Sequence, residues 1–403
     1  MKKIAKSIFF KIRDIVTLRP LRYWVRRMRL LKRMRIVMEK LEQEIDNDNT
    51  VYIFQIQMFD FQGIQCFNGG AERYVTDLAQ VLFSCGYNPV LIQQGDSKVG
   101  VWQKTVGNLK VYGLPFDSWY MTAIRMLKRY KFVIYSGAVE WGKKLHPNIM
   151  ISHGITWDSY NDITPAKKIK RFFDNVDKLV SVDTNTISWL RTTFPQDFKD
   201  FDAVYVPNYV DTKRYYPADK KHDDKITITF PRRASPERGY WLMSAALPPI
   251  LEKYKNIVFK FVGFAHGEAI QNDILRLESM YPERITHCMV SPDEMPAIYQ
   301  NTDISLIPTI YCEGTSLSCL EAMACGNVVI ATNIGGLPNL VLDGFNGVLI
   351  NPTGQDLMRA LDIVLSDSAL MDKLSSNAVK VANAFDKTVW QNRWTNIVSN
   401  MQE

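Results

Sequence analysis

The sequence lacks any run of about 18 consecutive apolar residues, the minimum for a helix that crosses a bilayer. The first 40 residues also lack the continuous apolar core and the small-residue cleavage site of a secretory signal peptide. Of the 403 residues, 46% are hydrophobic and 23% are charged, proportions that are typical of a soluble globular protein. We therefore expect a chain of two folded domains that does not cross a membrane unaided.

Residue spacings that mark metal and redox sites are absent as well. The six cysteines form no C-x-x-C pair, and no two of the five histidines are arranged as H-x-x-x-H. Zinc sites and thiol redox centres usually contain such pairs. The sequence therefore predicts no metal and no cofactor, and its cysteines indicate free thiols in a reducing cytoplasm.

Charge is unevenly distributed, because residues 1–40 contain 14 lysines and arginines but only two acidic residues. Apolar residues are interspersed with this charge, as in a cationic helix that lies on an anionic membrane surface. We interpret residues 1–48 as a basic amphipathic N-terminal arm of this kind. A solvated helix packed on the protein itself and a nucleic-acid-binding arm are the alternatives. The rest of the chain contains no recognisable nucleic-acid-binding module, so we expect no nucleic-acid partner.

From residue 51 onward, short β-branched or aromatic segments alternate with helical ones, as in β-α-β units on a parallel sheet. The strands expected in the first half are 51–57, 89–93, 132–135, 148–152, 179–182 and 203–206. After a polar stretch at 212–225, those expected in the second half are 226–230, 258–262, 303–308, 328–332 and 347–350. The pattern predicts an α/β protein with two Rossmann-like parallel-sheet domains, 49–210 and 211–385, that face each other across a cleft. Residues 386–403 are predicted to form an amphipathic C-terminal helix.

The most informative segment follows the expected strand 303–308. It contains Glu313 and, eight positions later, Glu321, within the string EGTSLSCLEAMACG. Glu313 is expected on a loop, and Glu321 about two turns into a short helix that ends at a glycine. One carboxylate can then face a bound ligand while the other supports it. A capping box between Ser318 and Glu321 is the alternative interpretation of the second glutamate.

The start of the same predicted helix provides free backbone N–H groups, which attract anions and phosphate above all. These are the amides of Gly314, Thr315, Ser316 and Leu317. Two cations follow another strand, in the string PRRASPERG at residues 231–239. Arg233 and Arg238 of this loop could hold a diphosphate and neutralise the charge on a departing nucleoside diphosphate. Solvated surface arginines are the alternative.

Taken in order along the chain, these motifs resemble those of the retaining glycosyltransferases of family 4, which have the two-domain GT-B fold. The resemblance covers residues 51–385, and its most specific part is the E-x7-E pair, Glu313 and Glu321. The other matching strings are GGAER from Gly69, VPNYVD from Val206, RASPERG from Arg233, IGGLP from Ile334 and DGFNG from Asp343. In this family the C-terminal helix crosses back to the first domain.

The resemblance implies a role for each matching residue. Arg233 and Arg238 would hold the donor diphosphate, Glu313 would face the transferred sugar, and Glu321 would bind the ribose hydroxyls. His153, which follows another expected strand, would hydrogen-bond donor or acceptor hydroxyls near the acceptor end of the cleft; a histidine that merely closes a strand end is the alternative. The other donor-binding residues that it implies are Gly69, Gly70, Gly314, Thr315, Ser316, Leu317, and Met289 and Val290 beside the base.

The expected activity is transfer of a sugar from a nucleoside-diphosphate donor to a saccharide or lipid-linked acceptor, with retention and without a metal. The basic arm, residues 1–45 in particular, would hold the enzyme at the inner face of the cell membrane of a bacterium, where cell-surface polysaccharide is made. A nucleotide-sugar epimerase of the same fold is an alternative. A catalytically inactive scaffold that docks on a membrane is another.

Three residues depart from the family's motifs. Arg238 stands at a lysine position, which keeps the charge but changes the shape of the cation. Asn339 stands where a glutamate is usual, and Tyr209 replaces the glycine of P-N-G-V-D. None of the three removes a residue on which the expected chemistry depends.

Overall fold

The computed structural model describes residues 48–115, 129–137, 144–155, 166–218 and 225–402, with single positions among 21–39, at 127 and among 158–163. The predicted basic arm, residues 1–48, therefore lies largely outside the described residues. The chain packs as two compact units. One contains residues up to 137 with 143–149 and 398–403, and the other contains residues 150–397 with 138–142. The domain boundaries predicted from the sequence stay predictions.

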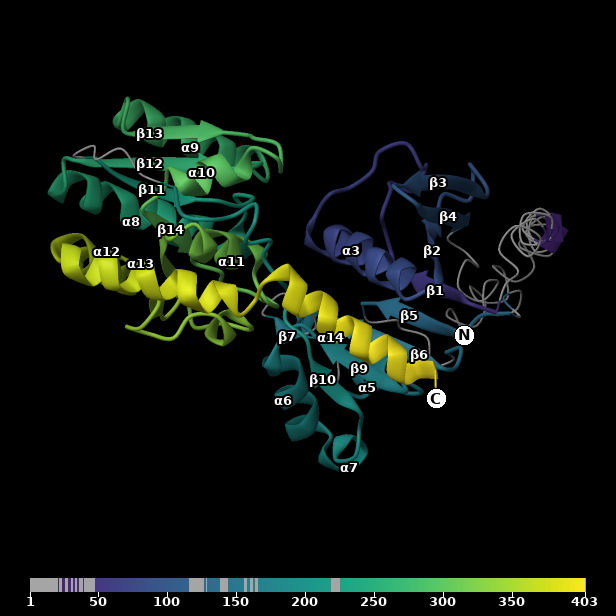
Figure 1. The fold of residues 1–403 in the computed structure, drawn as a ribbon. Helices are drawn as coiled ribbons and strands as arrows, with labels where there is room; N and C mark the ends of the chain where they lie inside the picture. The colour runs from purple at the N-terminus through teal and green to yellow at the C-terminus, as the bar shows by residue number, and fades with distance from the viewer. Residues whose placement is uncertain are drawn as a thin grey trace, which may run out of the picture. The chain divides into compact units, whose positions relative to one another are not determined.

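The first part of the chain forms an eight-stranded sheet with the order β10-β9-β6-β5-β1-β2-β4-β3 (Figure 1). Its strands are β1 (Thr50–Phe54), β2 (Asn88–Gly95), β3 (Trp102–Val106), β4 (Leu109–Pro115), β5 (Phe132–Ser136), β6 (Asn148–Ser152), β9 (Lys178–Ser181) and β10 (Ala203–Tyr205). β1 pairs in parallel with β2 and β5, whereas the edge strand β3 is antiparallel to β4. Every residue of β1, β5 and β6 is buried, as expected for strands that are covered on both faces.

The second part forms a six-stranded, fully parallel sheet with the order β13-β12-β11-β14-β15-β16, of which Figure 1 labels the first four strands in sequence. Its strands are β11 (Ile226–Phe230), β12 (Ile257–Val262), β13 (Ile285–Cys288), β14 (Ile304–Ile307), β15 (Val328–Thr332) and β16 (Val348–Ile350). The direction of strand addition reverses between β11 and β14, which are neighbours. In open parallel sheets, ligands bind at the carboxyl ends of the strands beside such a switch point. The predicted α/β fold with two parallel-sheet parts is thereby confirmed.

Helices cover these sheets. They are α3 (Gly70–Ser84), α5 (Ala166–Phe173), α6 (Thr184–Thr193), α7 (Pro195–Phe198), α8 (Tyr240–Lys253), α9 (Glu268–Met280), α10 (Met295–Gln300), α11 (Leu317–Ala324), α12 (Gly354–Ser366), α13 (Ser368–Asn383) and α14 (Lys387–Ser399). One core cluster of the second part joins strand residues such as Phe230, Phe259 and Leu306 to Leu247 of α8 and Leu361 of α12. The carboxyl ends of the strands are thus held by a core that leaves little freedom to the backbone around them.

The predicted C-terminal helix is present as α14, with Trp390, Trp394 and Val398 buried. The ring of Tyr209 lies 4.5 Å from that of Trp390, so the side chain that replaces a glycine packs against this helix. The hydroxyl of Tyr87 donates to the carbonyl of Val398 at 3.4 Å. The Tyr209 ring thus packs on α14, and Tyr87 forms a hydrogen bond with the last turn of that helix.

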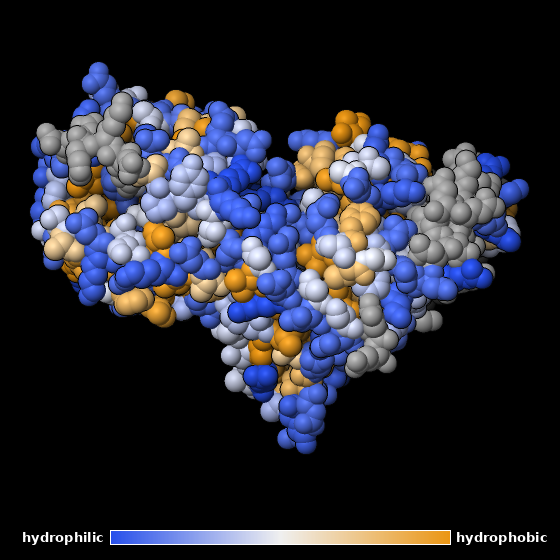
Figure 2. All heavy atoms as spheres, viewed as in Figure 1, coloured by the Kyte–Doolittle hydropathy of each residue, from blue (hydrophilic) through white to orange (hydrophobic). Residues whose placement is uncertain are grey.

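Among the residues that the structure describes, no helix is both long enough and apolar enough to cross a bilayer. On the face drawn in Figure 2, hydrophobic residues occur in small groups between hydrophilic ones. All six cysteines are free thiols.

Candidate functional site

The candidate site lies where the segments that follow β11 and β14 come together. The first segment contains a single 3₁₀ turn, Pro236–Arg238, and ends at Gly239, whose φ is +80°. A Cβ atom on Gly239 would lie 1.8 Å from the carbonyl oxygen of Pro308, so only glycine lets the two segments approach this closely. The string PRRASPERG is therefore pressed against the loop that carries Glu313.

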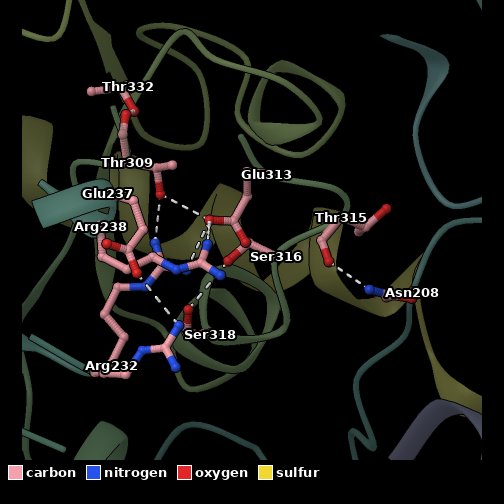
Figure 3. Close-up of polar contacts among 11 residues, drawn as sticks. Asn208, Arg232, Glu237, Arg238, Thr309, Glu313, Thr315, Ser316, Ser318 and Thr332 are labelled. Atoms are coloured by element: carbon pink, nitrogen blue, oxygen red, sulfur yellow. Dashed lines mark hydrogen bonds and ion pairs between the residues drawn. The ribbon is translucent and has the colours of Figure 1, made fainter. Parts of the chain in front are cut away.

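Three donors converge on one oxygen of Glu313 (Figure 3). Its Oε2 atom accepts hydrogen bonds from Arg232 Nη2 at 2.8 Å, from Arg238 Nη1 at 2.5 Å and from Thr309 Oγ1 at 2.8 Å. Arg232 also donates from Nη1 to Thr309 Oγ1 at 2.7 Å. The Glu313 side chain is 9% exposed, and Arg232 and Arg238 are 10% and 28% exposed. The group is thus a largely buried cluster of one carboxylate and two guanidiniums.

The charges of this cluster support one another. Burial alone would raise the pKa of Glu313, but Arg232 and Arg238 outweigh it and hold that pKa below its ordinary value. Burial lowers the pKa of the Arg232 guanidinium, which Glu313 in part restores. An arginine titrates so far above neutrality that it keeps its charge here. Glu313 is therefore ionised at neutral pH, and the cluster carries a net positive charge.

Arg233 and Arg238, predicted as a pair, occupy different surroundings. Arg238 bonds to Glu313, whereas Arg233 is 53% exposed and lies 3.5 Å from Glu237. The cation that sequence reasoning missed is Arg232. Successive side chains of an extended segment point to opposite sides, and Arg232 and Arg233 directly follow β11, so this alternation was the available signal.

The helix that begins after Glu313 is α11, with Ser316 as its N-cap residue and no side-chain bond to the cap. Leu317 is its first residue, so the amides of the first turn are at the position expected for an anion site. The alternative of a capping box between Ser318 and Glu321 is wrong, because neither residue stands at a capping position. Glu321 is 5% exposed and accepts a hydrogen bond from the Tyr299 hydroxyl at 3.2 Å.

The loop around Gly314 also touches segments that follow β6 and β9. A Cβ atom on Gly314 would lie 2.5 Å from the carbonyl oxygen of His153, so this contact too requires glycine. The Thr315 hydroxyl donates to the carbonyl of Val182, and the Asn208 amide donates to the carbonyl of Thr315 at 2.6 Å (Figure 3). The loop around Gly314 is thereby held by the segments that follow β6, β9 and β10.

Burial of the His153 ring disfavours its charged form and lowers its pKa to about 4. The imidazole is therefore neutral at physiological pH and can offer one donor and one acceptor nitrogen to hydroxyl groups. Nearby, Asn339 makes two hydrogen bonds with Thr184, accepting from its backbone N–H at 3.1 Å and donating to its hydroxyl at 2.7 Å. Asn339 thus joins α6 to the segment after β15.

The other predicted residues lie on separate elements. Gly69 is the N-cap residue of α3 and Gly70 is its first residue. These two belong to the other compact unit. Met289, which is 71% exposed, and Val290 follow β13. Within the described part of the chain, no group of three histidine, cysteine or acidic residues is placed to hold a metal ion.

Comparisons with known proteins agree with this fold. Residues 212–381 match the family model described as glycosyl transferases group 1. An uncharacterized glycosyltransferase of Methanocaldococcus jannaschii is 28% identical over 171 residues, covering 42% of this chain and 43% of that protein. A component of the phosphatidylinositol N-acetylglucosaminyltransferase of Arabidopsis thaliana is 22% identical over 324 residues, covering 74% of this chain and 71% of that protein.

Among solved structures, Anabaena HepE in complex with UDP and glucose superposes with a TM-score of 0.67 at 16% identity, covering 87% of this chain and all of that one. At this identity the likeness shows the fold, which is of the GT-B type. The match to the archaeal relative spans less than half of that protein's length. The segment matched by the family model includes Arg232, Arg238 and Glu313.

Proposed function

We propose that the protein is a retaining, metal-independent glycosyltransferase of family 4 that takes a sugar from a nucleoside-diphosphate donor. The observation that carries the proposal is the cluster at the carboxyl ends of β11 and β14. It places the Arg238 guanidinium and the ionised Glu313, which Arg232 also helps to neutralise, beside the N-terminus of α11. A ligand that combines a diphosphate with a sugar suits both kinds of group.

The proposed chemistry follows from the charges. As the bond between the anomeric carbon and the diphosphate oxygen breaks, negative charge grows on the diphosphate, while a hydroxyl oxygen of the acceptor bonds to the anomeric carbon and its proton passes to the departing diphosphate. Arg233, Arg238 and the first amides of α11 stabilise that charge, which removes the need for a bound cation. Glu313 and Glu321 accept hydrogen bonds from hydroxyls of the transferred sugar and of the ribose, respectively. The neutral His153 binds a hydroxyl on the sugar side of the site.

The donor glycines Gly69 and Gly70, and Met289 and Val290 beside the base, complete the proposed binding site. UDP-sugars are the first donors to test, since UDP and glucose are present in the HepE complex. The proposed acceptor is a saccharide or a lipid-linked saccharide of a cell-surface polysaccharide. The Arabidopsis relative is named for an N-acetylglucosaminyltransferase, so UDP-N-acetylglucosamine belongs in the same panel.

The test is an assay of the full-length protein with a panel of nucleotide sugars and saccharide or lipid-linked acceptors. We expect acceptor-dependent release of nucleoside diphosphate and a product with the anomeric configuration of the donor. Arg233→Met should raise the donor KM by about 10-fold, since one phosphate contact is worth roughly one to two kcal/mol. Arg359→Met is the matched control, because Arg359 is 72% exposed and pairs only loosely with Asp356 at 3.5 Å.

Three outcomes would contradict this proposal. Conversion of the donor to its epimer without any acceptor would identify an epimerase. Failure of every nucleoside diphosphate to raise the melting temperature, together with no transfer, would identify an inactive scaffold. A product of inverted configuration would refute retention alone.

We also propose that residues 1–48 hold the protein on an anionic membrane surface. The support is the concentration of 14 lysines and arginines among the first 40 residues. Full-length protein should sediment with vesicles that contain phosphatidylglycerol, less so as salt is raised, whereas protein without residues 1–45 should stay in the supernatant. Equal sedimentation of both proteins would show that residues 1–45 do not bind the membrane. Equal sedimentation with neutral vesicles would show that charge does not drive the binding.

A further inference from the structure

Two consecutive arginines after β11 have opposite surroundings. Arg233 is 53% exposed and can reach a ligand in solvent, whereas Arg232 is 10% exposed and is engaged by Glu313 and Thr309. A buried guanidinium requires a countercharge and hydrogen-bond acceptors, and both are present for its two terminal nitrogens. Arg232 is therefore built into the protein rather than offered to the solvent.

Arg232 and Arg238 share the same acceptor atom, Glu313 Oε2, as Figure 3 shows. They differ in burial, because Arg238 is 28% exposed and comes from the 3₁₀ turn Pro236–Arg238 at the surface of the loop. Of the two cations, Arg238 can turn toward a ligand at the lower cost. Arg232 is held additionally by Thr309, whose hydroxyl accepts from Arg232 and donates to Glu313.

Because Arg238 bonds to Glu313, a diphosphate would have to compete with Glu313 for this guanidinium. If Arg238 were the only countercharge, its departure would leave a carboxylate that is 9% exposed without a partner, at a large free-energy cost. A second cation that stays in place removes this obstacle.

We propose that Arg232 is a positioning residue that keeps Glu313 neutralised, so that Arg238 can leave Glu313 and bind the donor diphosphate. The inference rests on the proposed function in one respect, the assignment of Arg238 to the diphosphate. Arg232 itself does not touch the donor. It sets the fraction of molecules in which Arg238 is released, and the apparent affinity for a diphosphate scales with that fraction.

The experiment is a double-mutant cycle on nucleoside-diphosphate affinity, measured by calorimetry with full-length protein and UDP, or with the diphosphate that stabilises the wild type most. Arg232→Met should weaken binding by about 10-fold, because Glu313 then retains Arg238. In a Glu313→Gln background, the same substitution should change the affinity by less than about 2-fold, since no carboxylate competes for Arg238. Arg232→Lys keeps the charge and should restore most of the affinity.

Equal losses in the two backgrounds would overturn the proposal, because they would show that Arg232 binds the diphosphate directly. Unchanged affinity of Arg232→Met in the Glu313 background would also overturn it. If Arg232→Met does not fold, Arg232→Gln, which is uncharged but still able to donate a hydrogen bond, decides by the same criteria. If no nucleoside diphosphate binds the wild type, the proposed function fails with it; if the wild type binds but the cycle shows no coupling, only the role of Arg232 fails.

Discussion

The polar residues at the strand ends of the six-stranded sheet differ in kind from those at the ends of β6 and β9. After β11 and β14 the site contains Arg232, Arg238 and an ionised Glu313. After β6 and β9 it contains His153, whose pKa is about 4, and Asp183, a fully buried residue whose pKa is raised, chiefly by burial. The charged form is thus favoured for Glu313 and disfavoured for His153 and Asp183.

This difference has a physical cause in how each group is paired. Two guanidiniums surround Glu313, so its charge is favoured in spite of burial. Asp183 accepts from the backbone N–H and the hydroxyl of Thr186, and no cation among the described residues contributes to its pKa. This difference supports the proposed placement of the diphosphate beside Arg238 and of the sugar hydroxyls beside His153.

The largest effect is expected for Glu313→Gln, which removes the negative charge between Arg232 and Arg238. We expect sugar transfer to fall by about 10²–10³-fold, the usual loss when one charged hydrogen-bonding group is taken from an active site. The loss should appear mainly in kcat if Glu313 acts on the sugar in the transition state. Steady-state kinetics with saturating acceptor measure it.

Glu252→Gln is the control for this substitution, because Glu252 is an exposed carboxylate near the end of α8. It should leave the kinetics unchanged. Transfer by Glu313→Gln at the wild-type rate would show that the charged cluster serves only to hold the two loops together.

The strands around the charged side could be predicted closely from the sequence. The expected strand 226–230 coincides with β11, and 303–308 contains β14, because ITITF and ISLI are short segments rich in β-branched and apolar residues. The position of Glu313 on the loop and of Glu321 inside α11 was also predicted. The orientation of Arg232 was not, since composition identifies a cation but not the direction of its side chain.

The edge of the eight-stranded sheet shows the opposite case. The antiparallel pair β3 and β4 was not among the expected strands. β3 has three exposed residues, Gln103, Lys104 and Thr105, and so lacks the apolar pattern on which strand prediction depends. The contacts of His153 and Val182 with the Gly314 loop could not be predicted either, because they join segments more than 100 residues apart.

The pH dependence of stability tests whether His153 is kept neutral in the folded protein. Its folded pKa of about 4 lies below the ordinary value of 6.5, so the unfolded chain binds a proton that the folded protein does not as the pH falls through this range. His153 therefore costs nothing at pH 7.5 and about 2 kcal/mol of unfolding free energy at pH 5.

In urea unfolding, His153→Gln should lose less stability between pH 7.5 and pH 5 than the wild type does, by about this amount. His266→Gln, which replaces an exposed histidine, is the control, and its loss of unfolding free energy between pH 7.5 and pH 5 should match that of the wild type. Identical pH sensitivity of wild type and His153→Gln would contradict this, because it would show that the folded protein protonates His153 as readily as the unfolded chain does.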